Sequence, residues 1–153
     1  RHGGEQAPGL PGLVGALLDQ VAAGIPEGRG VFLLLDRGLA WPEAIRQARG
    51  LGWKVVARLQ GQTRVIPAGG EERRADELVT RGGRTRACEA DVFKDAGWVH
   101  GWAVACWPAR CEEPWLLYSD EPDGRRAVRM YACRMRIEEQ FRDLKSHGLD
   151  WQE

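Results

Sequence analysis

The chain has 153 residues, 43% of them hydrophobic, and its 22 basic and 22 acidic residues give a formal net charge of zero. This length and apolar content allow one domain with a core, and the balanced charge argues against a dedicated DNA-coating domain. The chain also lacks an apolar run near the ~20 residues that span a bilayer and the layout of a signal peptide, so we expect a cytoplasmic protein with no membrane partner.

The first half of the chain predicts an α/β arrangement. An amphipathic helix is expected over Leu10–Ala23, followed by an apolar strand over Val31–Leu35 that ends at Asp36. A second helix begins at Pro42, and a second strand covers Trp53–Leu59. A strand, a helix and a strand in this order predict a right-handed crossover with parallel pairing. The fold class is therefore expected to be α/β.

Residues 60–114 differ from what precedes them, with short β-prone pieces, a polar arginine-rich middle and scattered glycines. The β-prone pieces are Thr63–Ile66 and Trp98–Trp107. This composition indicates a mostly β insertion with exposed loops. Trp115–Ser119 then returns to a short core strand, and a long helix is expected from about Arg126 to His147, with Gly148 as its cap.

The last helix carries a spaced set of functional side chains. Tyr131, Arg134, Glu138 and Lys145 form the pattern Y-x2-R-x3-E-x6-K, and at ~100° per residue they project within about 60° of arc. An apolar stripe beside them is expected to seat the helix on a core. Its members are Met130, Ile137, Phe141 and Leu144.

Asp36 is the second acidic candidate, because functional groups of open α/β sheets gather at the carboxyl ends of strands. A carboxylate there is costly to bury unless it is paired or bound to a metal. Asp36 could instead cap the following turn or pair with Arg37, and Glu138 could be solvated surface. If Asp36 and Glu138 meet, they could bridge magnesium ions for in-line phosphoryl transfer, with basic neighbours holding the DNA backbone.

The chain resembles the DDE transposases of bacterial insertion sequences, in the subgroup marked by a Tyr-Arg-Glu-Lys signature. The segments that carry the resemblance are VFLLLDRGLAWPEAI, GWKVVARL, EPWLLYS and YACRMRIEEQFRDLKSHGLDW. It implies an incomplete ribonuclease-H-like domain, with a core formed by residues 1–59 and 115–153 and a β-rich insertion over residues 60–114. It also implies metal-dependent cleavage of transposon ends and strand transfer into target DNA.

The resemblance implies a role for each matching residue. Asp36 and Glu138 would be the second catalytic Asp and the catalytic Glu, and both would bind Mg²⁺, for which Mn²⁺ can substitute. DNA contacts would come from Arg37, Tyr131, Arg134 and Lys145. Trp98 or Trp102 could stack on an unstacked base, although both could instead pack the small core of the insertion.

One feature of the family has no counterpart, namely its first catalytic Asp on the opening strand of the fold. Asp19 is no substitute, because it lies on the polar face of the expected first helix. The chain also begins at Arg1, so we expect a fragment of a longer protein that is inactive by itself and dimeric when complete. The alternatives are a catalytically inactive remnant, a DNA-binding module, or a metal-dependent nuclease of the same fold.

Four cysteines without C-x-x-C spacing and only three histidines make a zinc site unexpected. Free thiols in a reducing cytosol are the expectation instead.

Overall fold

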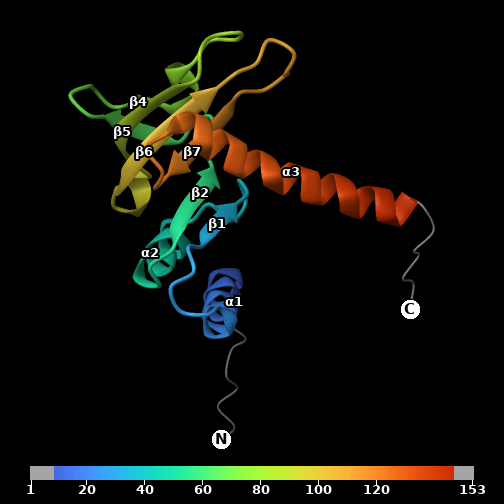
Figure 1. Cartoon of the computed structure of the whole chain (residues 1–153). Coiled ribbons are helices and arrows are strands. Elements are labelled where there is room, and N and C mark those ends of the chain that lie inside the picture. The colour runs from blue at the N-terminus through green and yellow to red at the C-terminus, as the bar shows by residue number, and fades with distance from the viewer. Residues whose placement is uncertain (1–8, 147–153) are drawn as a thin grey trace, which may run out of the picture.

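The computed structural model describes residues 9–146, except for the side chains of residues 144–146. One seven-stranded sheet, with the order β1-β2-β7-β6-β5-β3-β4, forms its centre (Figure 1). The helices are α1 (Leu10–Gly24), α2 (Pro42–Gly50) and α3 (Gly124–Ser146), with short 3-10 turns at η1 (Ala75–Leu78) and η2 (Lys94–Ala96). The strands are β1 (Phe32–Leu35), β2 (Lys54–Arg58), β3 (Arg64–Pro67), β4 (Arg73–Arg74), β5 (Arg86–Val92), β6 (Val99–Cys106) and β7 (Trp115–Ser119). None of the helices within this described range is long and apolar enough to cross a membrane.

The predicted strand, helix and strand are confirmed as β1, α2 and β2. β1 and β2 pair in parallel, with Leu35 opposite Ala57. Proline at the first turn of α2 fits the fixed backbone angle that a helix start requires. Since both strands run in the same direction, the residues that follow Leu35 and Ala57 emerge at one end of the sheet. Asp36 and Arg58 are therefore neighbours at that end.

Residues 60–114 continue the same sheet. β3, β4, β5 and β6 are antiparallel to their neighbours, and β6 pairs with β7, which in turn pairs with β2. The sequence pattern missed β5, because two of its inward residues, Cys88 and Ala90, are small and alternate with charged neighbours, which leaves Val92 as its one large buried side chain. The division of the chain into a core and an insertion stays a prediction.

The sheet has an apolar core on each face. Val55 and Ala57 of β2 face α1 and α2, whereas Val56 between them faces α3. This alternation follows from the two-residue period of a strand. All three side chains are fully buried, so β2 is a central strand that is apolar on both faces.

The predicted seating of α3 is wrong in its details. Ala127 and Tyr131 are fully buried against the sheet, whereas Ile137 is 52% and Phe141 is 62% exposed and Met130 is half-buried. The reason is positional, because only the N-terminal part of α3 crosses the sheet and the rest extends past it (Figure 1). Leu144 belongs to α3, but its side chain is outside the described part. The side of α3 that carries Tyr131, and not the apolar stripe, therefore packs against the core.

Helix α1 is apolar on more than the side that it buries. Leu18 is buried and Val14 is partly buried in the core that α1 shares with α2. The remaining large apolar side chains of the helix are exposed, namely Leu10, Leu13, Leu17 and Val21. The predicted amphipathic helix is present, but the face predicted to be buried is buried only in part.

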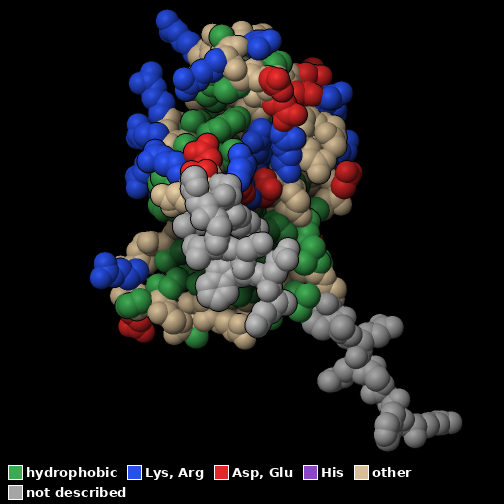
Figure 2. Space-filling view, turned by 90° about the vertical axis from the view of Figure 1, so that its right-hand side faces the viewer, with side chains coloured by type: hydrophobic (Ala, Val, Ile, Leu, Met, Phe, Trp, Pro, Cys, Tyr) green, Lys and Arg blue, Asp and Glu red, His purple; other side chains and the backbone are tan. Residues whose placement is uncertain are grey.

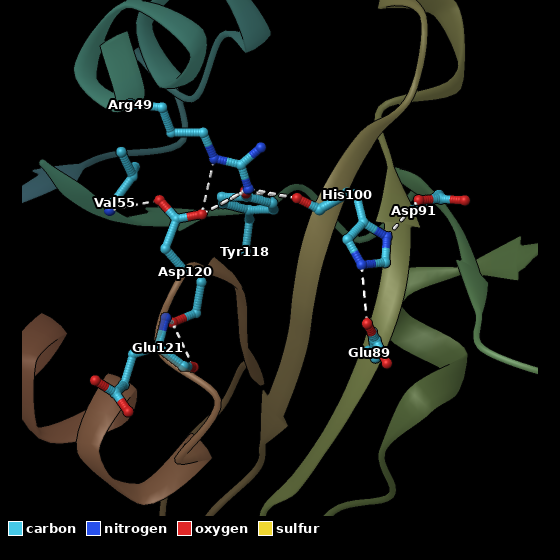
Figure 3. A network of polar contacts seen from close by, with 9 residues as sticks. Arg49, Val55, Glu89, Asp91, His100, Tyr118, Asp120 and Glu121 are labelled. Atoms are coloured by element: carbon cyan, nitrogen blue, oxygen red, sulfur yellow. Dashed lines mark hydrogen bonds and ion pairs between the residues drawn. The ribbon is translucent and has the colours of Figure 1, made fainter. Parts of the chain in front are cut away.

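A polar network ties α2 to the centre of the sheet (Figure 3). Asp120 accepts hydrogen bonds from Arg49 Nε (2.9 Å), from the Tyr118 hydroxyl (2.8 Å) and from the backbone N–H of Val55 (2.8 Å). Burial, and then the Asp120 carboxylate, raises the pKa of Tyr118. Gly101 packs against this ring, because a Cβ there would lie 2.6 Å from the nearest ring carbon. The network joins α2 to the start of β2 and the end of β7.

The start of α3 depends on Asp123. Its Oδ1 accepts hydrogen bonds from the backbone N–H groups of Arg125 (2.9 Å) and Arg126 (3.2 Å), and so acts as the N-cap.

Asp123→Ala should lower the free energy of unfolding by about 1 kcal/mol, measured by urea denaturation, because two helical donors lose their partner. Asp123→Ser, which can still cap, should recover most of the loss. Equal losses in the two variants would contradict the capping role.

Candidate active site

Asp36, at the carboxyl end of β1, and Glu138, on α3, are brought together by Arg134 of α3, which contacts both. The Tyr131 hydroxyl donates to Asp36 Oδ1 at 3.3 Å, and Arg134 Nη2 lies 3.4 Å from Asp36 Oδ2. The same Arg134 nitrogen lies 2.7 Å from Glu138 Oε1. Both carboxylate side chains are a little under half exposed. Two acidic residues from distant parts of the chain thus share one cation.

Whether a metal ion would fit between Asp36 and Glu138 can be judged from the position of Arg134. Its guanidinium lies between two carboxylates that would otherwise repel each other, as a stand-in for a cation. The donors are carboxylate oxygens, the hard ligands that Mg²⁺ prefers, and Mg²⁺ fills its remaining positions with water and phosphate oxygens. Among the described residues no group of three or more His, Cys, Asp and Glu side chains could hold a metal. The residues present fit a site with two protein carboxylates.

Tyr131 is both a core residue and a member of the site. Its side chain is fully buried, and its ring packs edge-on against Trp115 with the centroids 5.7 Å apart. Burial is the main cause of a raised pKa for Tyr131, and the nearby Asp36 carboxylate raises it further. The hydroxyl therefore stays protonated and remains a hydrogen-bond donor at neutral pH.

Arg58 also belongs to this site, although no sequence motif marks it. It lies over the Trp115 ring, with its Cζ 5.9 Å from the centroid, and donates to the Pro114 carbonyl at 3.4 Å. Its Nε is buried and, within the described range, has no hydrogen-bond partner. Buried donors are rarely left unsatisfied, so Arg58 has capacity for an additional acceptor. The sequence did hold a signal, because the predicted parallel pairing places Arg58 beside Asp36.

Arg37 is directed away from the carboxylate pair. Its guanidinium pairs with Glu113 on the connection between β6 and β7, and this contact lowers the pKa of Glu113. Arg58 Nη2 approaches the same carboxylate at 3.7 Å. Since Glu113 is 62% exposed, this pairing is weak enough to be exchanged for another anion. The proposed pairing of Asp36 with Arg37 is not what the structure contains.

The other residues predicted to contact DNA lie farther from Asp36 or outside the described side chains. Lys145 lies in the last turn of α3, and its side chain is outside the described part. Trp98 precedes β6 and lies by register at the end of the sheet opposite Asp36, and Trp102 lies in the middle of β6. Both rings are half-buried, and no contact within residues 9–143 joins either ring to the four clustered side chains. Trp115 is the tryptophan that the structure places at the site.

The surface around α3 is uneven in charge. Lys and Arg side chains gather along one side of the upper part of the face in Figure 2, whereas Asp and Glu lie mainly toward the other side. Helix α3 contributes exposed arginines, namely Arg125, Arg129, Arg136 and Arg142. A zero net charge therefore coexists with local basic surface suited to a phosphate backbone.

Comparison with known proteins places the chain in a family. A family model described as "Transposase DDE domain" matches residues 11–152, nearly the whole chain. No curated protein matches the chain.

Proposed function

We propose that this chain forms part of the catalytic domain of a DNA transposase of the Tyr-Arg-Glu-Lys subgroup. The premise is that the chain belongs to the transposase DDE domain family. The observation that carries this proposal is the meeting of Asp36 and Glu138 around Arg134. Its reaction would be cleavage at transposon ends followed by strand transfer into target DNA. Residues 1–59 and 115–153 would form the ribonuclease-H-like core, and residues 60–114 the insertion.

Asp36 and Glu138 would hold Mg²⁺, or Mn²⁺ in its place. Metal held by these two residues would supply activation of the attacking water or 3′-hydroxyl and stabilisation of the leaving oxygen in an in-line displacement. The protein's own part would be to hold the two carboxylates close together, and this is supported by the contact of Arg134 with both.

The basic and aromatic side chains would position the DNA. Arg134 and the Tyr131 hydroxyl are close enough to the carboxylates to contact a phosphate next to the cleaved bond, and Lys145 would extend this contact along α3. We add Arg58, whose unsatisfied Nε is an available donor. Arg37 could join them if a phosphate replaces Glu113. A role for Trp98 or Trp102 in stacking on a base remains part of the proposal.

The direct test measures metal binding to the chain itself. Mn²⁺ titrated into isotope-labelled protein should broaden the NMR signals around Asp36 and Glu138 first, because paramagnetic broadening is strongest nearest the ion. Asp36→Asn and Glu138→Gln should each remove the effect, whereas Glu139→Gln, a change at the exposed neighbour, should retain it. Broadening centred on other carboxylates, or broadening that persists in both site variants, would count against the proposal.

Arg134 and Lys145 should control DNA affinity. Arg134→Ala or Lys145→Ala should weaken DNA complexes and lower the slope of log affinity against log salt by about one each, since each loses one phosphate contact. Fluorescence anisotropy with a labelled duplex over a range of salt concentrations measures both quantities. Glu139→Gln serves as a charge-altering control that should not lower the slope. An unchanged slope in the arginine and lysine variants would make the stripe purely structural.

Two further parts of the proposal concern the complete protein. The described cluster holds two carboxylates, so the first catalytic Asp of the family would come from outside this chain, and the complete protein would act as a dimer on paired ends.

The second candidate is a catalytically inactive remnant or DNA-binding module, favoured by the absence of a third carboxylate among the described side chains. Product analysis separates a nuclease, which would release ends without joining them to target DNA.

A further inference from the structure

A second site is suggested by a cavity on the face of the sheet opposite α3. Its volume is about 450 Å³, within the range of small-ligand pockets. The floor is formed by Ala103, Ala105 and Cys88, with Leu78 of η1 and Pro67 of β3 as apolar walls. These side chains belong to or border the core that packs against α1 and α2. The cavity is therefore an open extension of that core.

Two arginines supply the charge of this cavity. Arg73 of β4 and Arg86 of β5 both line it, and no described carboxylate forms an ion pair with either. Cys88 lines the same cavity as the two arginines. Burial raises the pKa of its thiol, and the charges of Arg73 and Arg86 act in the opposite direction. Glu77 also lines the cavity, but its Oε2 accepts a hydrogen bond from the backbone N–H of Arg74 at 3.1 Å.

We propose that this cavity binds a nucleotide through its phosphate, with Arg73 and Arg86 on the phosphate and the alanine floor beneath the sugar and base. Two guanidinium forks suit a doubly charged group with several acceptor oxygens better than a single carboxylate. The cavity is larger than a bare phosphate requires, and its apolar floor suits a flat ring. The Thr85 side chain at the rim is a further polar group.

The site is separate from the Asp36 cluster, but its Arg86 lies at the same end of the sheet as that cluster. Arg86 is opposite Ala105, which is opposite Leu116, and Leu116 accepts a hydrogen bond from the N–H of Leu59, the residue after Arg58. β5 is four strands from β1, about 19 Å at ~4.8 Å per strand. The nucleotide could therefore be free in solution or part of a DNA strand that leaves the Asp36 cluster.

Cys88 provides a readout that needs neither metal nor cleavage. Alkylation by N-ethylmaleimide, followed at each cysteine by mass spectrometry, should be slowed at least fivefold at Cys88 by saturating thymidine monophosphate. Exposed Cys133 on α3 is the internal control and should react at an unchanged rate. Thymidine, which lacks the phosphate, should protect weakly or not at all. Because Asp36 and Glu138 take no part, failure here is distinguishable from failure of the proposed transposase activity.

Variants and a second probe complete the test. Combined Arg73→Ala and Arg86→Ala should abolish protection, whereas Arg84→Ala, a nearby exposed arginine outside the cavity lining, should retain it. Protection by the mononucleotide supports a free nucleotide as ligand, and protection only by a short single-stranded oligonucleotide supports a DNA strand. Absence of protection by both probes, or protection that survives in the double arginine variant, would overturn the proposal.

Discussion

Glu138→Gln in a transposase that contains this chain should lower cleavage of transposon ends by at least about 10³-fold, because removing one group that stabilises the transition state costs that much in other enzymes. Glutamine keeps the size of the side chain and can still contact Arg134, which lies 2.7 Å from Glu138 Oε1. It cannot supply the negative charge that a divalent cation requires. Binding to the ends should stay within about twofold, since the substitution removes no cation that contacts phosphate.

Two measurements check this expectation on one preparation. Gel-based cleavage of labelled transposon ends in Mg²⁺ gives the loss of rate, and gel retardation without metal gives the affinity. Glu139→Gln is the matched control, because Glu139 is the exposed neighbour on the same turn of α3 and should cleave normally. Full activity of the Glu138 variant would remove Glu138 from the site, and an equal loss in both variants would point to damage to α3.

Much of this site was predictable because its elements follow from local patterns. An apolar run ending in Asp36 predicts a buried strand with a carboxylate at its end, and helical spacing places Arg134 and Glu138 together. Neither pattern states that the two elements meet. The contact of Arg134 with both carboxylates depends on α3 crossing the sheet next to β1, which is tertiary information. The resemblance to a family supplied that link.

The errors have physical causes as well. Helical periodicity marks Ile137 and Phe141 as a buried face, but periodicity carries no information on how far the sheet extends beneath a helix. β5 was missed because two of its inward side chains, Cys88 and Ala90, are small and most of its outward ones are charged. Arg58 was overlooked because an arginine at the end of a strand is common, and only its place beside Trp115 gives it a role.

Tyr131→Ala should have the largest effect on stability, lowering the free energy of unfolding by about 3–5 kcal/mol, the range for removal of large aromatic side chains from cores. The ring is fully buried and packs with Val56, Leu117 and Trp115. Alanine would leave a cavity between α3 and the sheet that these side chains cannot fill. Urea denaturation measures the loss as a lower midpoint at an unchanged slope.

Tyr131→Phe separates the two roles of this residue. Phenylalanine keeps the packing and loses only the hydroxyl, whose 3.3 Å hydrogen bond to Asp36 is long, so the loss of stability should be at most about 1 kcal/mol. If the hydroxyl also contacts a phosphate, the same variant should bind DNA more weakly although it is nearly as stable. A phenylalanine variant as unstable as the alanine variant would contradict the packing argument. The aromatic ring of Tyr131 anchors α3 on the sheet, and its hydroxyl contacts Asp36. A change in how this ring packs would therefore move Arg134 and Glu138 relative to Asp36. Stability and the geometry of the proposed site are coupled at this residue.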